Sequence, residues 1–260
     1  MRLDVYLAET GKARSRARAK ELIDGGCVTV DGRVVTKPSF DLGDEAHEVR
    51  VFDELPYVSR GGLKLEAALK CFGMDVFGKR ALDIGASTGG FTDCLLQRGA
   101  VQVVAVDAGE GQLAGKLLAD ARVTSLERTN ARELTLEMIG GEAVDLIVMD
   151  VSFISATYIL PRFPELMGKS GHAICLIKPQ FEVGRSMLGK GGIVKDAAAH
   201  RYAIERVLES GRGVGLSATG LIPSPIEGGD GNREFLVHFV KDNTNAPTVD
   251  TSTITRVIKG

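Results

Sequence analysis

The sequence predicts an α/β protein in which a Rossmann-like, mostly parallel sheet of about seven strands follows a small α+β module. Two observations lead to this fold class. From residue 61 onward, short apolar strand-like runs alternate with helix-like runs, which is typical of a parallel sheet covered by helices on both faces. Residues 1–53 instead show two helix-like segments and then a hairpin. A chain of 260 residues is long enough for one large domain and one small module.

The N-terminal module, residues 1–53, is expected to contain two short helices and a small sheet. A helical pattern begins at Leu3, and a second helix is expected over residues 15–23. A Gly-Gly pair ends that helix, and the following CVTVDGRVV alternates around an Asp-Gly turn, which is typical of a β-hairpin. A third strand is expected at EVRVF, residues 48–52.

Charge is unevenly distributed in this module. The net charge of the chain is only −2, but the segment from Gly11 to Lys20 contains five basic residues and no acid. A basic face can bind phosphates even when the total charge is close to zero. The alternative is an ordinary solvated helix face. The candidate nucleic-acid contacts in this segment are Arg14, Arg16, Arg18 and Lys20.

The composition argues against secreted and membrane proteins. The four cysteines form no C-x-x-C pair and have no histidine at metal-ligand spacing, so they are expected to be reduced thiols rather than bridges or zinc ligands. Charges interrupt the apolar residues at the N-terminus, unlike in a secretory signal. No apolar run approaches the roughly 20 residues that a transmembrane helix requires. We therefore expect a soluble, cytoplasmic protein without a membrane span and without a metal.

A polar joint over residues 54–60 connects the module to the alternating domain, which is expected over residues 61–241. A helix is expected directly after the joint, in SRGGLKLEAAL. The expected strands are then, in chain order, ALDIG, VQVVAVD, a weak VTSLE, VDLIVMD, HAICLIK, VGLSATGLI and REFLVHFV. Between them, helices are expected in FTDCLLQRG, GQLAGKLLA, YILPRFPELM and residues 197–210. Residues 242–260 are polar, and we expect them to form a frayed tail.

A glycine-rich turn follows the first of these strands. In ALDIGASTGGF, residues 81–91, the glycines let the backbone approach a ligand closely. The next strand ends in Asp107, about 22 residues beyond Gly85, where an acid can accept hydrogen bonds from ribose hydroxyls. Nicotinamide dinucleotides usually bind a G-x-G-x-x-G turn, but this turn lacks the second glycine and is preceded by Asp83. An acid at that point suits the cationic S-adenosyl-L-methionine better than a dianionic pyrophosphate.

The candidate cofactor site is therefore one for S-adenosyl-L-methionine. Asn130, after the expected third strand, is placed for the adenine end, although a helix N-cap explains this residue equally well. The complete set of candidate cofactor contacts is Asp83, Gly85, Ala86, Ser87, Gly89, Gly90, Phe91, Asp107, Asn130 and Asp150.

The same turn also matches G-x-S-x-G, the nucleophile elbow of α/β hydrolases. That interpretation requires a histidine in a loop at the end of a strand. His172 and His238 fall inside apolar runs, and His200 falls on an expected helix. A serine hydrolase is therefore a remote alternative, and Ser87 is better explained as a cofactor contact.

Two lysines and two acids are expected at one edge of the sheet. Asp150 and Lys178 each end a strand, Glu234 opens the last strand, and Lys64 lies in the helix after the joint. Each has an ordinary explanation, and lysines in particular often bury their stems while the amine stays in water. Their expected positions nevertheless converge beside the glycine-rich turn, at the edge where ligands bind to such sheets.

Several motifs resemble those of known families. Residues 1–53 resemble the RNA-binding domain named after small-ribosomal-subunit protein four, through the RLD start, the Ser/Arg-rich helix and the V-x-V-D-G hairpin. SRGGLKL, DIGASTGGFTDCLL, VDAGEGQL, MDVSFIS, LIKPQFEVG and NREF resemble the FtsJ/RrmJ-type RNA 2′-O-ribose methyltransferases. Over residues 1–240, the chain looks like the TlyA-type rRNA 2′-O-methyltransferases, a family often labelled hemolysin.

This resemblance implies an S-adenosylmethionine-dependent methyltransferase fold whose last strand is antiparallel, which brings Glu234 to the same rim as the strand ends. It implies a tetrad of catalytic residues, namely Lys64, Asp150, Lys178 and Glu234, and 2′-O-methylation of a cytidine in ribosomal RNA. Lys178 would act as the base or stabilise the developing oxyanion, with Asp150 orienting it. Lys64 and Glu234 would position the ribose. Charges of both signs around Lys178 leave its protonation state open.

The resemblance also implies ribosomal RNA or a ribosomal subunit as the partner. Arg14, Arg18 and their neighbours would lie against the RNA backbone, which gives affinity rather than base choice. Arg60 beside the joint and Lys190 in the basic, glycine-rich loop 184–196 complete the candidate RNA contacts. That loop is either a mobile flap facing the RNA or a plain surface loop. The rival class is an RNA-binding or hemolysin-type interaction protein without catalysis, but direct lysis needs an apolar or amphipathic segment that is not evident in the sequence.

Overall fold

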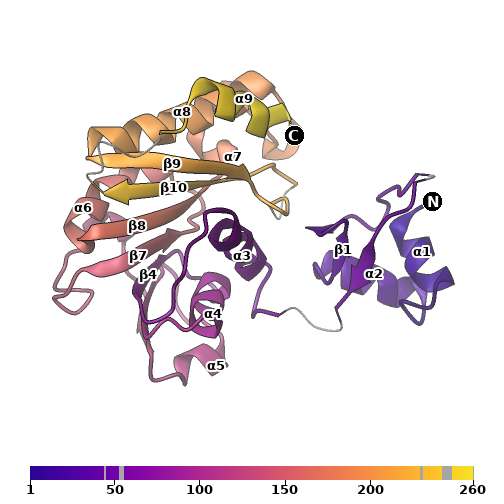
Figure 1. Ribbon diagram of the computed structural model, residues 1–260, viewed down its shortest axis with the longest axis horizontal. Coiled ribbons are helices and arrows are strands. Elements are labelled where there is room, and N and C mark those ends of the chain that lie inside the picture. Colours follow the sequence, from indigo (N-terminus) through magenta and orange to yellow (C-terminus); the bar gives the residue numbers. More distant parts are fainter. Residues whose placement is uncertain (44, 53–55, 229–230, 242–247, 260) are drawn as a thin grey trace. The chain divides into compact units, whose positions relative to one another are not determined.

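The computed structural model divides the chain into two compact units, Met1–Arg60 and Gly61–Gly260 (Figure 1). The structure describes residues 1–43, 45–52, 56–228, 231–241 and 248–259. The end of the predicted module and the start of the predicted joint, residues 53–55, lie outside the described part of the chain.

The smaller unit contains the predicted helices and hairpin. Its sheet has the order β2-β1-β3, in which both outer strands run antiparallel to β1. Ser15 caps the second helix, because its Oγ accepts a hydrogen bond from the backbone N–H of Arg18. The elements are α1 (Leu3–Glu9), α2 (Arg16–Asp24), β1 (Val28–Val30), β2 (Arg33–Val34) and β3 (Val49–Val51).

Asp4 ties α1 to α2. Its buried carboxylate forms ion pairs with Arg2 at 2.9 Å and with Arg16 of α2 at 3.0 Å. Hydrogen bonds from Arg2 and then Arg16 outweigh the effect of burial and lower the pKa of Asp4 to about 2. The carboxylate therefore stays ionised well into the acid range, and one of the predicted RNA contacts, Arg16, also has a structural partner.

Within the described residues, the larger unit is built on a sheet of seven strands, in agreement with the predicted number, and their order is β6-β5-β4-β7-β8-β10-β9. Strands β4 to β8 pair in parallel, whereas β10 runs antiparallel between β8 and β9. Most of their residues are buried because helices cover both faces. The strands are β4 (Arg80–Ile84), β5 (Gln102–Val106), β6 (Val123–Leu126), β7 (Val144–Met149), β8 (Met167–Ile177), β9 (Leu216–Pro223) and β10 (Phe235–Lys241).

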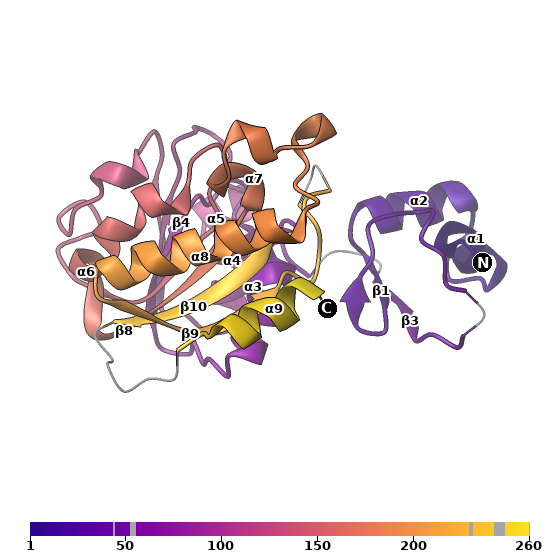
Figure 2. The ribbon, with the colours of Figure 1, turned by 90° about the horizontal axis from the view of Figure 1, so that it is seen from above.

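Helices lie on both faces of this sheet, as Figures 1 and 2 show together. One face carries α3 (Gly61–Cys71), α4 (Gly90–Gln97) and the short α5 (Gly115–Leu118). The opposite face carries α8 (Ala197–Gly213) and α9 (Thr251–Lys259), which pack against each other and against β9.

Two predicted helices are shorter than expected. The segment YILPRFPELM forms η2 (Ala156–Tyr158), η3 (Leu160–Arg162) and α6 (Phe163–Leu166) instead of one helix, and in GQLAGKLLA only α5 is helical. The two prolines of the first segment begin η3 and α6, where a missing N–H is tolerated but a continuous helix is not. The remaining short elements are η1 (Ala131–Glu133), α7 (Pro179–Glu182), η4 (Arg185–Met187) and η5 (Lys190–Gly192).

The prediction of a frayed C-terminal tail is wrong for residues 248–259, whereas residues 242–247 and 260 lie outside the described chain. Helix α9 begins after Asp250, whose carboxylate accepts a hydrogen bond from a first-turn backbone N–H. Its Ser, Thr, Val and Ile residues have low helix propensity, so packing rather than propensity stabilises it. Its apolar side chains share one helical face and are buried in the main core: Ile254, Val257 and Ile258.

The antiparallel strand β10 completes one functional edge of the sheet. Phe235, its first residue, pairs with Ile177, the last residue of β8. Glu234 therefore reaches the edge where β4, β7 and β8 end, although it comes from a strand that runs in the opposite direction.

Candidate active site

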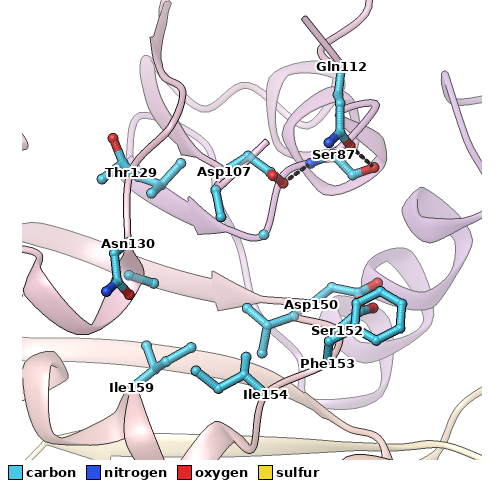
Figure 3. Close-up of a pocket in the computed structure, with 15 residues that line it drawn as sticks. Ser87, Asp107, Gln112, Thr129, Asn130, Asp150, Ser152, Phe153, Ile154 and Ile159 are labelled. Carbon is cyan, nitrogen blue, oxygen red and sulfur yellow. Dashed lines mark hydrogen bonds between the residues drawn. The ribbon is translucent and has the colours of Figure 1, made fainter. Parts of the chain in front are cut away.

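A cavity of about 480 Å³ opens at the carboxyl ends of β4, β5, β6 and β7 (Figure 3). Its walls come from the segments that follow these four strands, and Ile154 and Ile159 line its apolar side. This volume is typical of a site for a small organic ligand. The position at the carboxyl ends of parallel strands is the one that the sequence predicted.

The glycine-rich turn after β4 is packed against the segment after β7. Gly85 has a φ of +83°, and a Cβ atom there would lie 2.5 Å from the carbonyl oxygen of Asp150. Gly89 has a φ of +94°, and a Cβ atom there would collide with Leu117. Both positions therefore exclude any other residue, since side chains rarely adopt this φ and no space is left for them.

Asp107, at the end of β5, holds the turn in place from across the cavity. Its carboxylate accepts hydrogen bonds from the backbone N–H groups of Ser87 and Gly109, each at 2.7 Å. The Ser87 hydroxyl donates to Gln112 Oε1 at 3.1 Å, so Ser87 faces the cavity rim (Figure 3). Each carboxylate oxygen has a second lone pair, so Asp107 can accept further hydrogen bonds from a ligand in the cavity.

Asn130 is the N-cap that the sequence offered as one explanation, and it also lies in the cavity wall, where a contact to the adenine end of a cofactor stays a prediction. Its Oδ1 accepts a hydrogen bond from Arg132 N at 3.1 Å, which makes it the N-cap of η1. Its Nδ2 donates to Glu133 Oε1 at 2.7 Å, and the residue also lines the cavity. The cap fixes the side chain beside the ligand space.

Asp83 is fully buried behind the turn. Its Oδ2 accepts a hydrogen bond from the Thr92 hydroxyl at 2.6 Å, while Oδ1 has no hydrogen-bond partner among the described residues. Burial raises the pKa of Asp83 to about 7, an effect that the Thr92 hydrogen bond opposes and the negative charge of Asp150 increases. A buried carboxylate with an unused oxygen is unusual and is a candidate for a functional role.

The predicted cofactor contacts fall into two groups. Five of them line the cavity: Gly85, Ser87, Asp107, Asn130 and Asp150. The others do not line it: Asp83 lies on β4, Ala86 and Gly89 in the turn, and Gly90 and Phe91 in the first turn of α4.

The four predicted catalytic residues lie together at the edge of this cavity. Lys64 Nζ of α3 lies 2.6 Å from Glu234 Oε2 and 3.9 Å from Asp150 Oδ2. Lys178 Nζ, directly after β8, lies 2.6 Å from Asp150 Oδ1 and donates a hydrogen bond to Ser152 Oγ at 2.8 Å. Asp150 thus lies between the two lysines and is shared with the cavity wall.

The ion pair between Lys64 and Glu234 is buried. The Lys64 side chain is 9% exposed and that of Glu234 2%, so breaking this pair would leave an uncompensated charge in the interior. Burial raises the pKa of Glu234, an effect that the positive charge of Lys64 opposes. Asp150 Oδ1 is also buried, and its ion pair with Lys178 lacks hydrogen-bond geometry, so among the described residues it has no hydrogen-bond donor. That oxygen can accept a donor from a ligand.

Several residues at this site were not predicted from the sequence, and two of them, Ser152 and Phe153, lie next to Lys178 or at the mouth of the cavity. Ser152 accepts the hydrogen bond from Lys178, and Phe153 lines the cavity with 92% of its surface exposed and a φ of +65°. The rings of Phe153 and Phe181 lie 5.4 Å apart. An exposed aromatic residue in a strained backbone conformation is a signal that only the structure gives, since the letters DVSF contain no rare pattern.

The predicted RNA contacts lie in different settings. Arg14 and Lys20 are exposed, but Arg14 lies just before the cap of α2 rather than on the helix. Arg18 is paired with Glu21 at 3.0 Å. Arg60 is half-buried, and Lys190 is exposed in the loop 184–196.

The loop 184–196 is tied down at its C-terminal end. Asn232 is 1% exposed and lies two residues before Glu234. Its Oδ1 accepts a hydrogen bond from Val194 N at 2.9 Å, and its Nδ2 donates to the carbonyl of Gly192 at 3.3 Å. His200 of α8 lies 3.1 Å from the carbonyl of Val194. The loop therefore has an anchored end next to the start of β10.

The histidines lie where the sequence placed them. His172 is on β8, His238 on β10 and His200 on α8, and the hydrogen bond of the Ser87 hydroxyl goes to Gln112 rather than to any of them. His172 Nδ1 and His238 Nε2 lie 3.0 Å apart, and burial lowers the pKa of His238 to about 4. The geometry of a serine-hydrolase triad is therefore not formed around Ser87 within the described chain.

No helix among the described residues is long and apolar enough to cross a membrane. The same residues contain no group of three or more His, Cys, Asp or Glu side chains that could hold a metal ion.

The sheet order, with one antiparallel strand inserted next to the last, and the ligand site at the carboxyl ends of β4 and β5 define a Rossmann-like methyltransferase. The chain belongs to the FtsJ-like methyltransferase family, whose profile matches residues 57–241. The profile of the S4 domain matches residues 1–47. Both assignments confirm the resemblances that the sequence motifs indicated.

Related proteins are similar to this one over most of its length. It is 46% identical over 237 residues to the 16S/23S rRNA (cytidine-2′-O)-methyltransferase TlyA of Mycobacterium tuberculosis, covering 91% of this chain and 88% of that protein. It is 42% identical over 240 residues to Hemolysin A of Brachyspira hyodysenteriae, covering 92% and 100%. The solved structure of a putative hemolysin from Streptococcus thermophilus has a TM-score of 0.76 at 41% identity, covering 100% of this chain and 94% of that one.

Proposed function

We propose that this protein transfers a methyl group from S-adenosylmethionine to the 2′-hydroxyl of a cytidine in ribosomal RNA. The observation that carries the proposal is the contact between the tetrad and the cavity. Asp150 belongs to both, so a ligand in the cavity and a hydroxyl group at Lys178 would be neighbours. The 46% identical relative is named for this reaction, which supports the choice of substrate.

The cavity suits S-adenosylmethionine in size and in chemistry. Its volume is that of a small-molecule site, and Gly85 keeps the wall free of side-chain atoms. Asp107 would bind the ribose hydroxyls, and Asn130 with Ile159 would contact the adenine. The Asp150 carboxylate in the cavity wall and the buried Asp83 carboxyl behind it, whose Oδ1 has no hydrogen-bond partner among the described residues, favour a ligand that carries positive charge or hydrogen-bond donors. When bound, S-adenosylmethionine supplies a methyl group on a positively charged sulfur, which is a good electrophile.

Lys178 is the residue that acts on the ribose hydroxyl in this proposal. Its Nζ is fixed by Asp150 and Ser152, so its position is defined before the RNA binds. A neutral amine would take the hydroxyl proton, whereas an ammonium would stabilise the oxygen as negative charge develops on it. The dependence of kcat on pH separates these roles, because only the first requires the neutral amine.

Lys64 and Glu234 support the same site from the other side. Their 2.6 Å ion pair is buried, and Lys64 lies 3.9 Å from Asp150. The pair thereby fixes Asp150, and with it Lys178, at one edge of the sheet. Phe153, almost fully exposed at the mouth of the cavity, is available to stack on a base of the target RNA.

The S4 unit would supply affinity for ribosomal RNA. Arg14 and Lys20 are exposed on it, and contacts of this kind bind phosphates with little base preference. Binding that falls steeply with salt is the expected signature.

The test is methyl transfer to ribosomal subunits that lack the modification, followed by mapping of 2′-O-methyl groups. Lys178→Ala should lower kcat by about 10² to 10⁴-fold and leave S-adenosylmethionine binding intact. Lys169→Ala is the matched control, because Lys169 is an exposed lysine near the start of β8, the strand that Lys178 directly follows, and lies away from the tetrad. Near-normal turnover by a folded, cofactor-binding Lys178→Ala protein would refute the role of Lys178. RNA binding without methyl transfer by the wild-type protein would favour a non-catalytic interaction protein.

A further inference from the structure

Glu182 is a buried carboxylate at the base of the catalytic loops. It ends α7, four residues after Lys178, and is 2% exposed. Its Oε2 accepts a hydrogen bond from the Ser155 hydroxyl at 2.5 Å, and its Oε1 accepts one from the backbone N–H of Ala156 at 2.7 Å. Ser155 and Ala156 follow Asp150 on the other loop, so Glu182 joins the segment after β7 to the segment after β8.

These two segments are connected at three levels. At the active site, Lys178 contacts Asp150 and Ser152. Midway, the rings of Phe181 and Phe153 lie 5.4 Å apart. At the base, the Glu182 carboxylate holds Ser155 and Ala156.

The basal level is the most rigid of the three, because it is buried and its hydrogen bonds are directed. Ser155 also caps η2, with its Oγ accepting a hydrogen bond from Thr157 N at 3.2 Å. Arg206 of α8 donates to the backbone carbonyl of Glu182 at 2.5 Å, which anchors this residue to the helical layer. By contrast, Ser152 and Phe153 are exposed and receive little support from packing of their own.

We propose that Glu182 is a positioning residue for methyl transfer, which fixes the loop 151–155 so that Ser152 and Phe153 are held against Lys178 and the incoming nucleotide. The inference rests on the function proposed above. It adds a residue outside the tetrad, whose carboxylate touches neither the cavity nor the four catalytic side chains. Without the two carboxylate oxygens of Glu182, Ser155 and Ala156 lose their hydrogen-bond acceptors. The segment that carries Ser152 and Phe153 is then no longer held in one position.

The experiment compares Glu182→Ala, Glu182→Gln and Ser155→Ala with the wild-type chain. Gln can still accept from Ala156 N and can donate to Ser155 Oγ, so Glu182→Gln should keep kcat within about threefold. Glu182→Ala should lower kcat by about tenfold to hundredfold, while the stoichiometry of S-adenosylmethionine binding stays that of a folded protein. Ser155→Ala keeps the hydrogen bond from Ala156 N to Glu182 but removes the hydroxyl contact and the cap of η2, and it should give an intermediate loss. Leu216→Ala is the matched control, because Leu216 is a buried core residue at the opposite edge of the sheet.

Hydrogen exchange provides a second readout, which does not depend on activity. In Glu182→Ala, amides of residues 151–159 should exchange faster while those of β9 and β10 stay protected. In Leu216→Ala the pattern should be reversed. If Leu216→Ala loses kcat as strongly as Glu182→Ala at equal loss of thermal stability, or if exchange over 151–159 is unchanged in Glu182→Ala, the positioning role is refuted. If the wild-type protein methylates no RNA, the proposed function fails, and the exchange data still decide whether Glu182 fixes the loop.

Discussion

Substitution of Asp83 by Asn tests whether the buried carboxylate behind the glycine-rich turn is kept for a ligand rather than for stability. Asn has nearly the same shape, and its Oδ1 can still accept the hydrogen bond from the Thr92 hydroxyl. The substitution removes the charge and the titration together. The substitution therefore measures the energetic effect of burying the charge while the shape of the turn stays the same.

The magnitude follows from the pKa of Asp83, which burial raises from 3.8 to about 7. Between these values the folded state holds a proton that the unfolded state releases, so stability falls as pH rises through this window. Burial of the ionised Asp83 lowers the free energy of unfolding by about 4 kcal/mol once the carboxyl has fully titrated, above pH 7. About 3 kcal/mol of this loss occurs between about pH 5 and about pH 8. The difference in free energy of unfolding between Asp83→Asn and the wild-type protein should therefore shift by about 3 kcal/mol in favour of the variant from about pH 5 to about pH 8.

Urea unfolding at both pH values, without cofactor, measures this difference directly. Calorimetry with S-adenosylmethionine gives the functional half of the test: binding to the wild-type protein should strengthen as pH rises across the titration of Asp83, whereas binding to Asp83→Asn should be weaker and nearly independent of pH. Equal pH dependence of stability in the two proteins would refute the buried titration. Equal cofactor affinity at all pH values would refute the ligand role of Asp83.

Three further results are expected. Gly85→Ala should lose cofactor binding and destabilise the fold by more than about 1 kcal/mol, because φ is +83° and the new Cβ would meet the carbonyl of Asp150; calorimetry and thermal unfolding check this. Phe153→Ala should weaken RNA binding by about 1–3 kcal/mol in a filter-binding assay, as the ring is exposed for stacking; because Phe153 also lines the cavity, the assay is run at saturating S-adenosylmethionine. Because burial lowers the pKa of His238 to about 4, the folded state resists protonation and stability should fall as pH drops from about 6.5 toward 4, by at most about 3 kcal/mol. His238→Gln should flatten that fall in urea unfolding, and an unchanged slope would exclude His238 as its source.

The sequence predicted the site residues that lie at the ends of strands. Asp150 and Lys178 follow apolar runs, and the carboxyl ends of parallel strands share one edge, so their proximity follows from topology alone. Glu234 required knowledge that the last strand is antiparallel, which the family resemblance supplied. Apolar runs predicted the central strands well because helices on both faces bury most of their residues, whereas β6, which has no fully buried residue, gave only a weak pattern.

The remainder depends on contacts between segments distant in the sequence. Glu182 reads as an ordinary helix acid, and only the structure shows that its partners are Ser155 and Ala156, which lie 27 and 26 residues earlier in the chain. Helix α9 is composed of weak helix formers and forms because the core offers it an apolar surface. The exposure and positive φ of Phe153 are also set by the fold around it rather than by local propensity.

The position of β10 has a consequence for the order of events during synthesis. Strands β4 to β8 are complete once residue 177 has been made, yet Glu234 belongs to the segment that inserts between β8 and β9. Until that late insertion, Lys64 has no buried partner and two strand edges stay unpaired. In the proposed function the buried Lys64–Glu234 pair supports the site, so a nascent chain without β10 is expected to be inactive until β10 pairs with β8. Such pairing is slow in folding, so recovery of methyl transfer after dilution from denaturant should lag behind recovery of helical signal.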